Sequence, residues 1–201
     1  ADKEAQARTA MRAAFDRVAA LDRTLSDYQS TSELMRLCAR AGQGPVPISA
    51  DLFTVLEAAQ TLARRTGGAF DVTAGPATRL WRRARRLSEL PAADRVAEAH
   101  ALTGYRQLTL DPQARTATLA RPGMSLDVGG LAKGYAADEA ISLLTSHGLT
   151  RALVALGGDI VVSAPPPGRE GWTIDVASLD VPGAPRAHSL LLRDAAVSTA
   201  G

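Results

Sequence analysis

The sequence predicts an α+β fold (mixed α/β), and three observations support this prediction. Apolar residues recur at helical spacing through much of the first half, whereas short runs of strand-forming residues dominate the second half. One strand–Gly-Gly–helix–strand unit is expected across residues 124–156. This arrangement is typical of α+β and mixed α/β proteins. We therefore expect a single domain over 1–201, with a helical part at about 1–104 packed on a β-rich part at about 105–201.

The helices of the first half follow from periodicity and capping residues. Ser32 and Ser49 are good N-caps, and Pro91 suits a helix start. The Gly67-Gly68 pair is expected to end one helix, and Gly75-Pro76 is interpreted as a break in regular secondary structure. Helices are expected over residues 4–24, from Ser32 through Leu37, from Ser49 through Arg65 and over 92–102, with a short extended segment at 46–48.

The second half contains short apolar runs separated by turn residues. A plausible hairpin surrounds Asp111–Arg115, and a helix is expected to begin after Gly129-Gly130 and to end near His147. Residues 160–162 are expected to continue the strand before them. The other strands are expected at 106–110, 116–120, 124–127, 152–156, 172–176 and 188–192, with an extended piece at 197–201.

Composition limits the classes of function. The chain has 201 residues and a formal net charge of +2, and this near balance argues against general nucleic-acid binding. Its one cysteine, Cys38, cannot form an intrachain disulfide and is interpreted as a small apolar core residue. An arginine-rich run at 79–86 surrounds Trp81; we interpret it as a solvated, mobile face, with nucleic acid or acidic lipid as alternative partners.

The run from Leu126 to Asp138 is the strongest local signal for a ligand. It predicts a glycine turn that opens a helix, and helix N-termini bind anions such as phosphate. Lys133 is expected in the first helical turn, where a cation is unfavourable unless it faces an anion. The run does not match the phosphate-loop or dinucleotide fingerprints, so a simple tight turn is the alternative interpretation.

Several further motifs occur in a characteristic order along the chain. Leu25-Ser26-Asp27-Tyr28 comes first, then the segment 66–76 around Asp71, then the Lys133 run. Gly157-Gly158-Asp159 and the terminal Val-Ser-Thr-Ala-Gly follow. Together these motifs resemble the ApbE family, the FAD:protein FMN transferases, over nearly the whole chain from Leu25 onward.

This resemblance implies a function and a set of site residues. The family transfers FMN from FAD to a threonine hydroxyl of a partner protein, with Mg²⁺ and release of AMP. Carried over by position, it implies FAD contacts from Tyr28, Ala69, Phe70, Asp71, Asp127 and Lys133, and a magnesium ligand from the Gly130 carbonyl. Lys133 is also the candidate catalytic residue. Two alternatives stay open: an FAD pyrophosphatase that uses water as acceptor, and a non-catalytic flavin-binding module.

Structural interpretations of the same residues compete with these roles. Tyr28 is alternatively a half-buried tyrosine that closes a helix, Asp71 a capping carboxylate, and Asp159 a turn residue. The resemblance also implies an N-terminal strand and a C-terminal segment that this sequence lacks, so the remaining magnesium ligands are expected beyond Gly201. By resemblance the protein is expected in the periplasm or anchored to the inner membrane by a lipid outside this chain, with the cytoplasm as the alternative.

Overall fold

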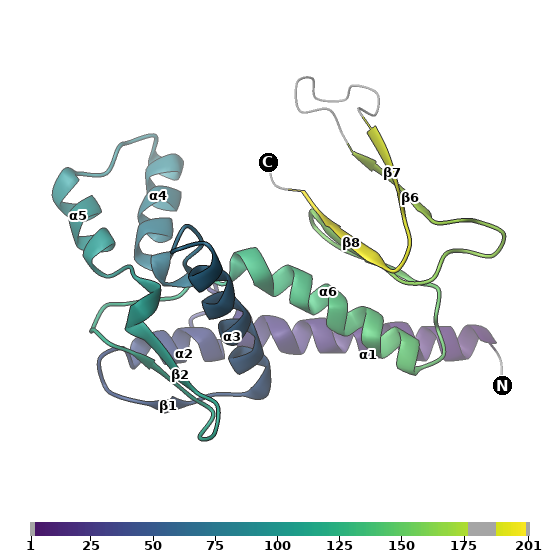
Figure 1. The fold of residues 1–201 in the computed structure, drawn as a ribbon, viewed down its shortest axis with the longest axis horizontal. Coiled ribbons are helices and arrows are strands. Elements are labelled where there is room, and N and C mark those ends of the chain that lie inside the picture. The colour runs from purple at the N-terminus through teal and green to yellow at the C-terminus, as the bar shows by residue number, and fades with distance from the viewer. Residues whose placement is uncertain (1–2, 177–187, 200–201) are drawn as a thin grey trace. The chain divides into compact units, whose positions relative to one another are not determined.

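The computed structural model describes residues 3–176 and 188–199 (Figure 1). The chain divides into two compact units. One comprises residues 21–132, and the other, here called the two-segment unit, comprises 1–20 together with 133–201. Helices and strands occur in both units, which confirms the predicted mixed class. That residues 1–201 act as a single domain stays a prediction.

Helices make up most of the 21–132 unit, which begins within α1 (Lys3–Leu25). Ser32 and Ser49 cap their helices as predicted, because each side chain accepts a hydrogen bond from the backbone N–H three residues later. The other helices of the unit are α2 (Glu33–Ala39), α3 (Ala50–Arg65), η1 (Val72–Ala74), α4 (Gly75–Leu87), α5 (Ala93–Ala101) and η2 (Tyr105–Gln107).

A small antiparallel sheet completes this unit. Its order is β1-β3-β2, formed by β1 (Val46–Pro47), β3 (Thr116–Leu119) and β2 (Leu108–Asp111). The predicted hairpin is confirmed, with Leu108 paired to Leu119 and Asp111 to Thr116. Fully buried leucines of α2 and α3, together with Leu119, Met124 and Leu126, form the core. Burial of such side chains stabilises the fold by about 1.5–3 kcal/mol each.

The strand predicted at 124–127 is not formed. Met124, Ser125 and Leu126 are buried, but the backbone donors of the segment bond to scattered partners instead of a neighbouring strand. The Leu126 N–H contacts Cys38 Sγ at 3.3 Å, and the Asp127 N–H donates to the Val72 carbonyl at 2.8 Å. A short apolar run therefore does not by itself establish a ladder of strand hydrogen bonds.

The predicted break at Gly75-Pro76 is instead the start of α4 (Figure 1). Proline is favourable in the first turn of a helix. The N–H groups of that turn have no intrahelical acceptor, so the N–H that proline lacks is not missed. Gly75 is required by close packing, since a Cβ there would lie 2.6 Å from the Ser125 carbonyl oxygen. The arginine-rich run is thus helical, an element that the sequence did not predict.

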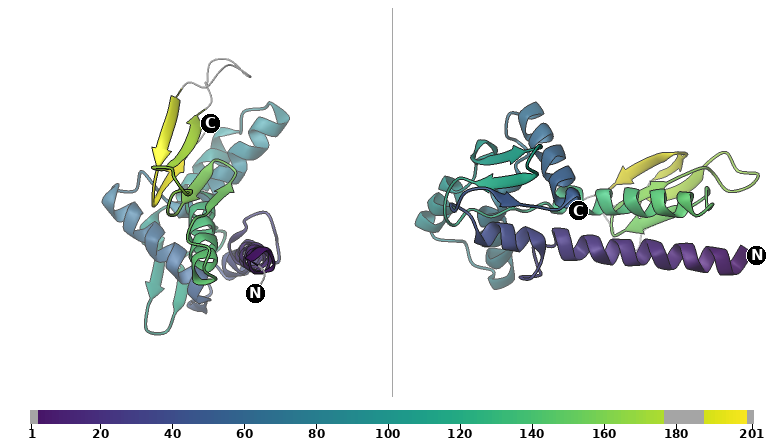
Figure 2. Two further views of the ribbon diagram at one scale, coloured as in Figure 1. Left: turned by 90° about the vertical axis from the view of Figure 1, so that its right-hand side faces the viewer. Right: turned by 90° about the horizontal axis from the view of Figure 1, so that it is seen from below.

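In the two-segment unit, α1 and α6 (Gly129–Ser146) lie side by side, as two views show (Figure 1, Figure 2). Ala10 and Ala14 of α1 are buried against Ala140 and Leu144 of α6. Arg17 and Glu139 form an ion pair between the two helices at 2.6 Å. The buried contact between the two helices is therefore made largely of small alanine side chains and one leucine.

The strands of this unit form two antiparallel sheets. One has the order β4-β5-β8, from β4 (Leu153–Leu156), β5 (Asp159–Val162) and β8 (Ala195–Ser198). The other pairs β6 (Trp172–Val176) with β7 (His188–Leu192), as predicted. Residues 160–162 do not continue β4 as expected. They turn back against it, because Gly157 at φ +65° and Gly158 form a two-residue hairpin turn.

None of the helices in the described part of the chain is long and apolar enough to cross a membrane.

Candidate functional site

Three side chains of the 21–132 unit meet around Arg82 of α4. Its guanidinium donates to Asp127 Oδ2 at 2.9 Å and to Asp27 Oδ2. It also covers one face of the Tyr28 ring, with Cζ 4.9 Å from the ring centroid. We call these residues, Asp27, Tyr28, Arg82 and Asp127, the Arg82 cluster. It brings together two residues predicted to contact FAD and one arginine that was assigned to a solvated patch.

The cluster fixes its charges in place. Both carboxylates are largely buried, at 12% and 15% side-chain exposure, so each needs a partner that compensates for lost water. Burial acts to lower the pKa of Arg82, but the hydrogen bond to Asp27 and the charges of Asp127 and Asp27 raise it above its ordinary value. Arg82 is therefore a permanent cation, and Tyr28, at 79% exposure, is the most exposed member of the cluster.

Asp127 also prepares the start of α6. Its Oδ1 accepts the Gly129 N–H at 2.9 Å, while its other oxygen is bound to Arg82. A Cβ at Gly129 would lie 3.1 Å from that Oδ1, so glycine lets the carboxylate close over the helix N-terminus. One side chain thus satisfies a free backbone donor and links it to the Arg82 cluster.

The predicted segment 69–71 has mixed roles. Asp71 caps η1 and accepts hydrogen bonds from the Thr73 N–H at 2.8 Å and the Thr73 hydroxyl at 2.6 Å, so its capping interpretation is confirmed. Phe70 packs at the first turn of α6, since a Cβ on Gly130 would lie 3.3 Å from Phe70 Cε2. Ala69 is exposed beside it. Phe70 and Gly130, predicted for different purposes, therefore lie in contact.

Lys133 belongs to the two-segment unit, where it lies beside the β4–β5 turn. Its Nζ is 3.4 Å from Asp159 Oδ2, and 4.0 Å from the position of a Cβ on Gly157. The lysine side chain is 57% exposed, whereas that of Asp159 is 16% exposed. We call Lys133, Gly157, Gly158, Asp159, Ser198 and Thr199 the Lys133 cluster. Lysine is rare in this chain, which has only one other, Lys3.

The prediction that Lys133 lies in the first turn of its helix is wrong. It is the fifth residue of α6, and its ammonium is stabilised by Asp159 across to the hairpin turn. The field of the helix dipole weakens beyond the first turn, so the unfavourable position inferred from sequence is mostly relieved. What distinguishes Lys133 is instead its exposed ammonium beside a glycine turn.

The terminal motif closes this cluster. Ser198 pairs with Asp159 across β5 and β8, and the Ser198 hydroxyl donates to Asp159 Oδ1. Thr199 donates its N–H to the Gly158 carbonyl at 2.9 Å. A Cβ on Gly158 would lie 2.3 Å from the Thr199 carbonyl oxygen, so only glycine permits this approach. Ala200 and Gly201, the rest of the motif, lie outside the described residues.

The described residues do not form a magnesium site by themselves. Mg²⁺ requires near-octahedral oxygen coordination, and the Gly130 carbonyl would supply one oxygen. Over residues 3–176 and 188–199 there is no group of three or more His, Cys, Asp or Glu side chains arranged to hold a metal.

Cys38 is buried, and this burial raises the pKa of its thiol even though the Leu126 N–H acts to lower it, which keeps the thiol neutral.

Sequence reasoning missed Arg82 as a site residue. Its neighbours, Arg79, Arg83, Arg85 and Arg86, are exposed and have the same residue type, so composition gave no reason to separate them. The available signal was helical spacing combined with the two aspartates, Asp27 and Asp127, which need a cation if they are buried. That signal depends on knowing that residues 75–87 form a helix.

The described geometry defines an α+β protein with an anchored aspartate–arginine cluster and an exposed lysine beside a glycine turn. The sequence model of the ApbE family matches residues 2–201. An FAD:protein FMN transferase of Treponema pallidum is 32% identical over 210 residues, which cover 98% of this chain and 58% of that protein. The chain belongs to the ApbE family.

Solved structures agree with this assignment. The structure of the ApbE protein from Thermotoga maritima has a TM-score of 0.86 at 27% identity, and covers 96% of this chain and 62% of that one. The flavin transferase ApbE from Vibrio cholerae has a TM-score of 0.83 at 26% identity, and the match covers 100% of this chain and 64% of that protein. This chain therefore spans about three fifths of the length of these proteins, and the predicted fold is confirmed.

Proposed function

We propose that this chain is the FAD-binding part of an enzyme that transfers FMN from FAD to a threonine hydroxyl of a partner protein and releases AMP. Family membership and the relatives named FAD:protein FMN transferase support this proposal. The observation that carries it is Lys133. Its side chain is 57% exposed, and its ammonium lies 3.4 Å from Asp159 beside the Gly157-Gly158 turn, where an anionic ligand can reach it.

The proposed reaction is a phosphoryl transfer from FAD to the threonine hydroxyl. The threonine oxygen forms a bond to the phosphorus of the FMN half, and the bond from that phosphorus to the bridging oxygen breaks. AMP leaves with that oxygen, and the hydroxyl proton passes to solvent or a base. Such reactions depend on positioning and charge neutralisation. In this proposal Lys133 neutralises phosphate charge, and the exposed ring of Tyr28 stacks on a flat ring of FAD.

Asp127 has a supporting role in this proposal. Arg82 and the Gly129 N–H hold both of its oxygens, so the carboxylate is oriented before any ligand arrives. Magnesium is proposed for the whole protein only. The described residues do not form a coordination shell for Mg²⁺ by themselves. A periplasmic or membrane-anchored location likewise remains a prediction from the resemblance.

An FAD titration with and without Mg²⁺ tests this proposal, followed by flavin fluorescence and by AMP release. Covalent flavin on a threonine-bearing protein or peptide, together with AMP, is the result expected of the transferase. AMP release without any protein acceptor would identify the pyrophosphatase instead. Tight FAD binding that ignores Mg²⁺ and yields no AMP would identify the non-catalytic module.

The two lysines provide a matched pair of variants for the assignment of Lys133. We expect Lys133→Ala to weaken FAD binding about tenfold or more, because a charged contact to phosphate contributes roughly 1.5–3 kcal/mol. Lys3→Ala removes the same charge from the exposed start of α1 and serves as the control. Equal FAD affinity in the two variants would remove Lys133 from the site.

A further inference from the structure

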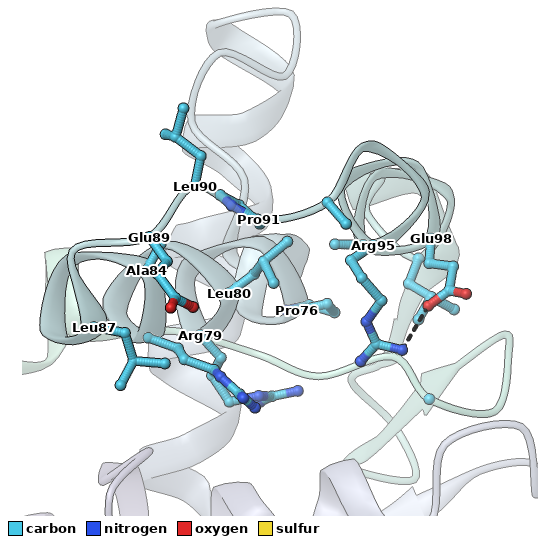
Figure 3. A pocket seen from close by; sticks show the side chains of 15 residues that line it. Pro76, Arg79, Leu80, Ala84, Leu87, Glu89, Leu90, Pro91, Arg95 and Glu98 are labelled. Carbon is cyan, nitrogen blue, oxygen red and sulfur yellow. Dashed lines mark hydrogen bonds and ion pairs between the residues drawn. The ribbon is translucent and has the colours of Figure 1, made fainter.

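The 21–132 unit has a hollow of about 760 Å³ between α4 and α5, drawn in Figure 3. Arg79, Leu80, Arg83 and Leu87 line it from α4, and Arg95 from α5. None of the residues predicted to contact FAD lines it. We call this hollow the α4–α5 groove. Its volume is in the range of pockets that bind ligands, roughly 300–1,000 Å³, so it can accept several side chains of a partner.

The two groove arginines of α4, Arg79 and Arg83, have no ion-pair partner within the described structure, whereas Arg95 of α5 is paired with Glu98. Helix α4 carries five arginines and no acidic residue, and Arg82 alone among them has ion-pair partners in the described residues. Arg79 and Arg83 lie four residues apart on the groove side, where like charges destabilise a helix by about 0.2–0.5 kcal/mol. Anions from a partner would relieve this repulsion.

The same hairpin exposes apolar side chains. Leu87 and Leu90, which line the groove, are 46% and 87% exposed, and Trp81 of α4, outside the lining, is 51% exposed. Concentrated exposure of this kind marks interaction surfaces, whereas single exposed residues are ordinary. Apolar cover would stabilise a complex by about 25 cal/mol per Å² buried.

The shape and the acidic residues of the groove favour a protein partner over a lipid or nucleic-acid surface. The groove is concave, so it admits a projecting side chain, whereas a flat bilayer would stay outside it. Glu89 and Glu98 also line the groove, and Glu98 holds Arg95 at 3.0 Å (Figure 3). These carboxylates repel a continuous row of phosphates, but a peptide can place its charges opposite Arg79 and Arg83 alone.

We propose that the α4–α5 groove is a docking surface for an acidic protein segment that carries an apolar anchor residue. The acidic side chains of the segment pair with Arg79 and Arg83, and its anchor packs on Leu80 and Leu87. Many specific interfaces combine an apolar centre with charged residues at the edge. This inference does not depend on the flavin chemistry, because the groove shares no predicted FAD contact.

The test uses the full 201-residue chain and a set of labelled acidic peptides in which the number and spacing of leucines vary. Binding is measured by fluorescence anisotropy over a range of salt concentrations. We expect saturable binding that weakens with salt and requires both glutamates and leucine. The double variant R79E/R83E should weaken it at least about tenfold, since two attractive charge contacts become repulsive.

Two further variants keep the test decisive. R12E/R23E makes the same charge change on exposed residues of α1 and should leave the peptide affinity unchanged. Leu90→Ser alters a side chain that is 87% exposed, so folding is preserved, and we expect a several-fold loss of affinity. Circular dichroism verifies that each variant is folded.

Three results would overturn the proposal. They are no saturable binding of any acidic peptide, equal loss in R12E/R23E, and binding of leucine-free peptides, single-stranded DNA or anionic phospholipid vesicles as strongly as the best peptide. The last result would reassign the surface to general anion binding.

Discussion

Arg82 donates to two carboxylates and keeps 39% of its side chain exposed, whereas Lys133 meets one carboxylate at 3.4 Å and keeps 57% of its side chain exposed. The first cation is bound on several sides by its own protein and supports folding and orientation. The second is only lightly held, so an arriving anion can recruit it at little cost. The contrast predicts a structural role for Arg82, and it is consistent with the ligand-binding role proposed for Lys133.

The largest effect is expected from Arg82→Ala, which leaves Asp27 and Asp127 largely buried and without their shared cation. We expect the free energy of unfolding to fall by about 2–3 kcal/mol, less than for a fully buried pair, because two largely buried carboxylates lose the cation that they share while Arg82 itself is 39% exposed. Urea denaturation measures it. Arg83→Ala, on the same helix with no ion pair in the described structure, should change stability by less than about 0.5 kcal/mol. Similar losses in both variants would contradict the contrast.

The next effect is expected from Gly158→Ala in the Lys133 cluster. Its Cβ would lie 2.3 Å from the Thr199 carbonyl oxygen, so β8 must move away from β5. We expect a loss of about 1–2 kcal/mol, within the usual cost of overpacking. Hydrogen exchange should show the Thr199 amide losing protection while the α2 and α3 amides of the other unit keep theirs. Uniform loss across the chain would show that the effect is not local.

Lys133→Ala should change stability much less than either. Its ion pair is exposed on the lysine side, and such pairs contribute about 0–1 kcal/mol. We expect a change within about 0.5 kcal/mol in thermal or urea unfolding, even where FAD affinity falls about tenfold. A destabilisation as large as that of Arg82→Ala would mean that Lys133 is structural and would end the comparison.

The smallest effect is expected at Asp138, further along α6. Burial, followed by the neighbouring Glu139 charge, raises the pKa of Asp138 above its ordinary value. The charged form is thus disfavoured by folding, so the penalty is present at neutral pH and disappears as the carboxyl becomes protonated in acid. Asp138→Asn should slightly stabilise the protein at pH 7 and match the parent below about pH 4. A stabilisation that persists in acid would exclude titration as its cause.

Local sequence signals determined most of the elements. Serine caps and apolar spacing set α2 and α3, and strand-forming runs around a turn set the β2–β3 hairpin, because these features depend on residues close together in the chain. Ordered motifs likewise indicated the family, and the match over residues 2–201 agrees. The strand predicted at 124–127 is wrong, because the hydrogen-bond partners of this segment come from distant residues and not from a neighbouring strand.

The candidate site divides in the same way. Residue type and the order of the motifs were enough to select Tyr28, Asp127 and Lys133 as candidate site residues, because these signals depend only on residues near each other in the sequence. Only the tertiary structure decided what these side chains face. It paired Asp127 with Arg82, assigned Asp71 to a cap, and set Lys133 against Asp159. The physical reason is that a buried charge takes its partner from whatever the fold brings within hydrogen-bond distance, and sequence separation does not limit that choice.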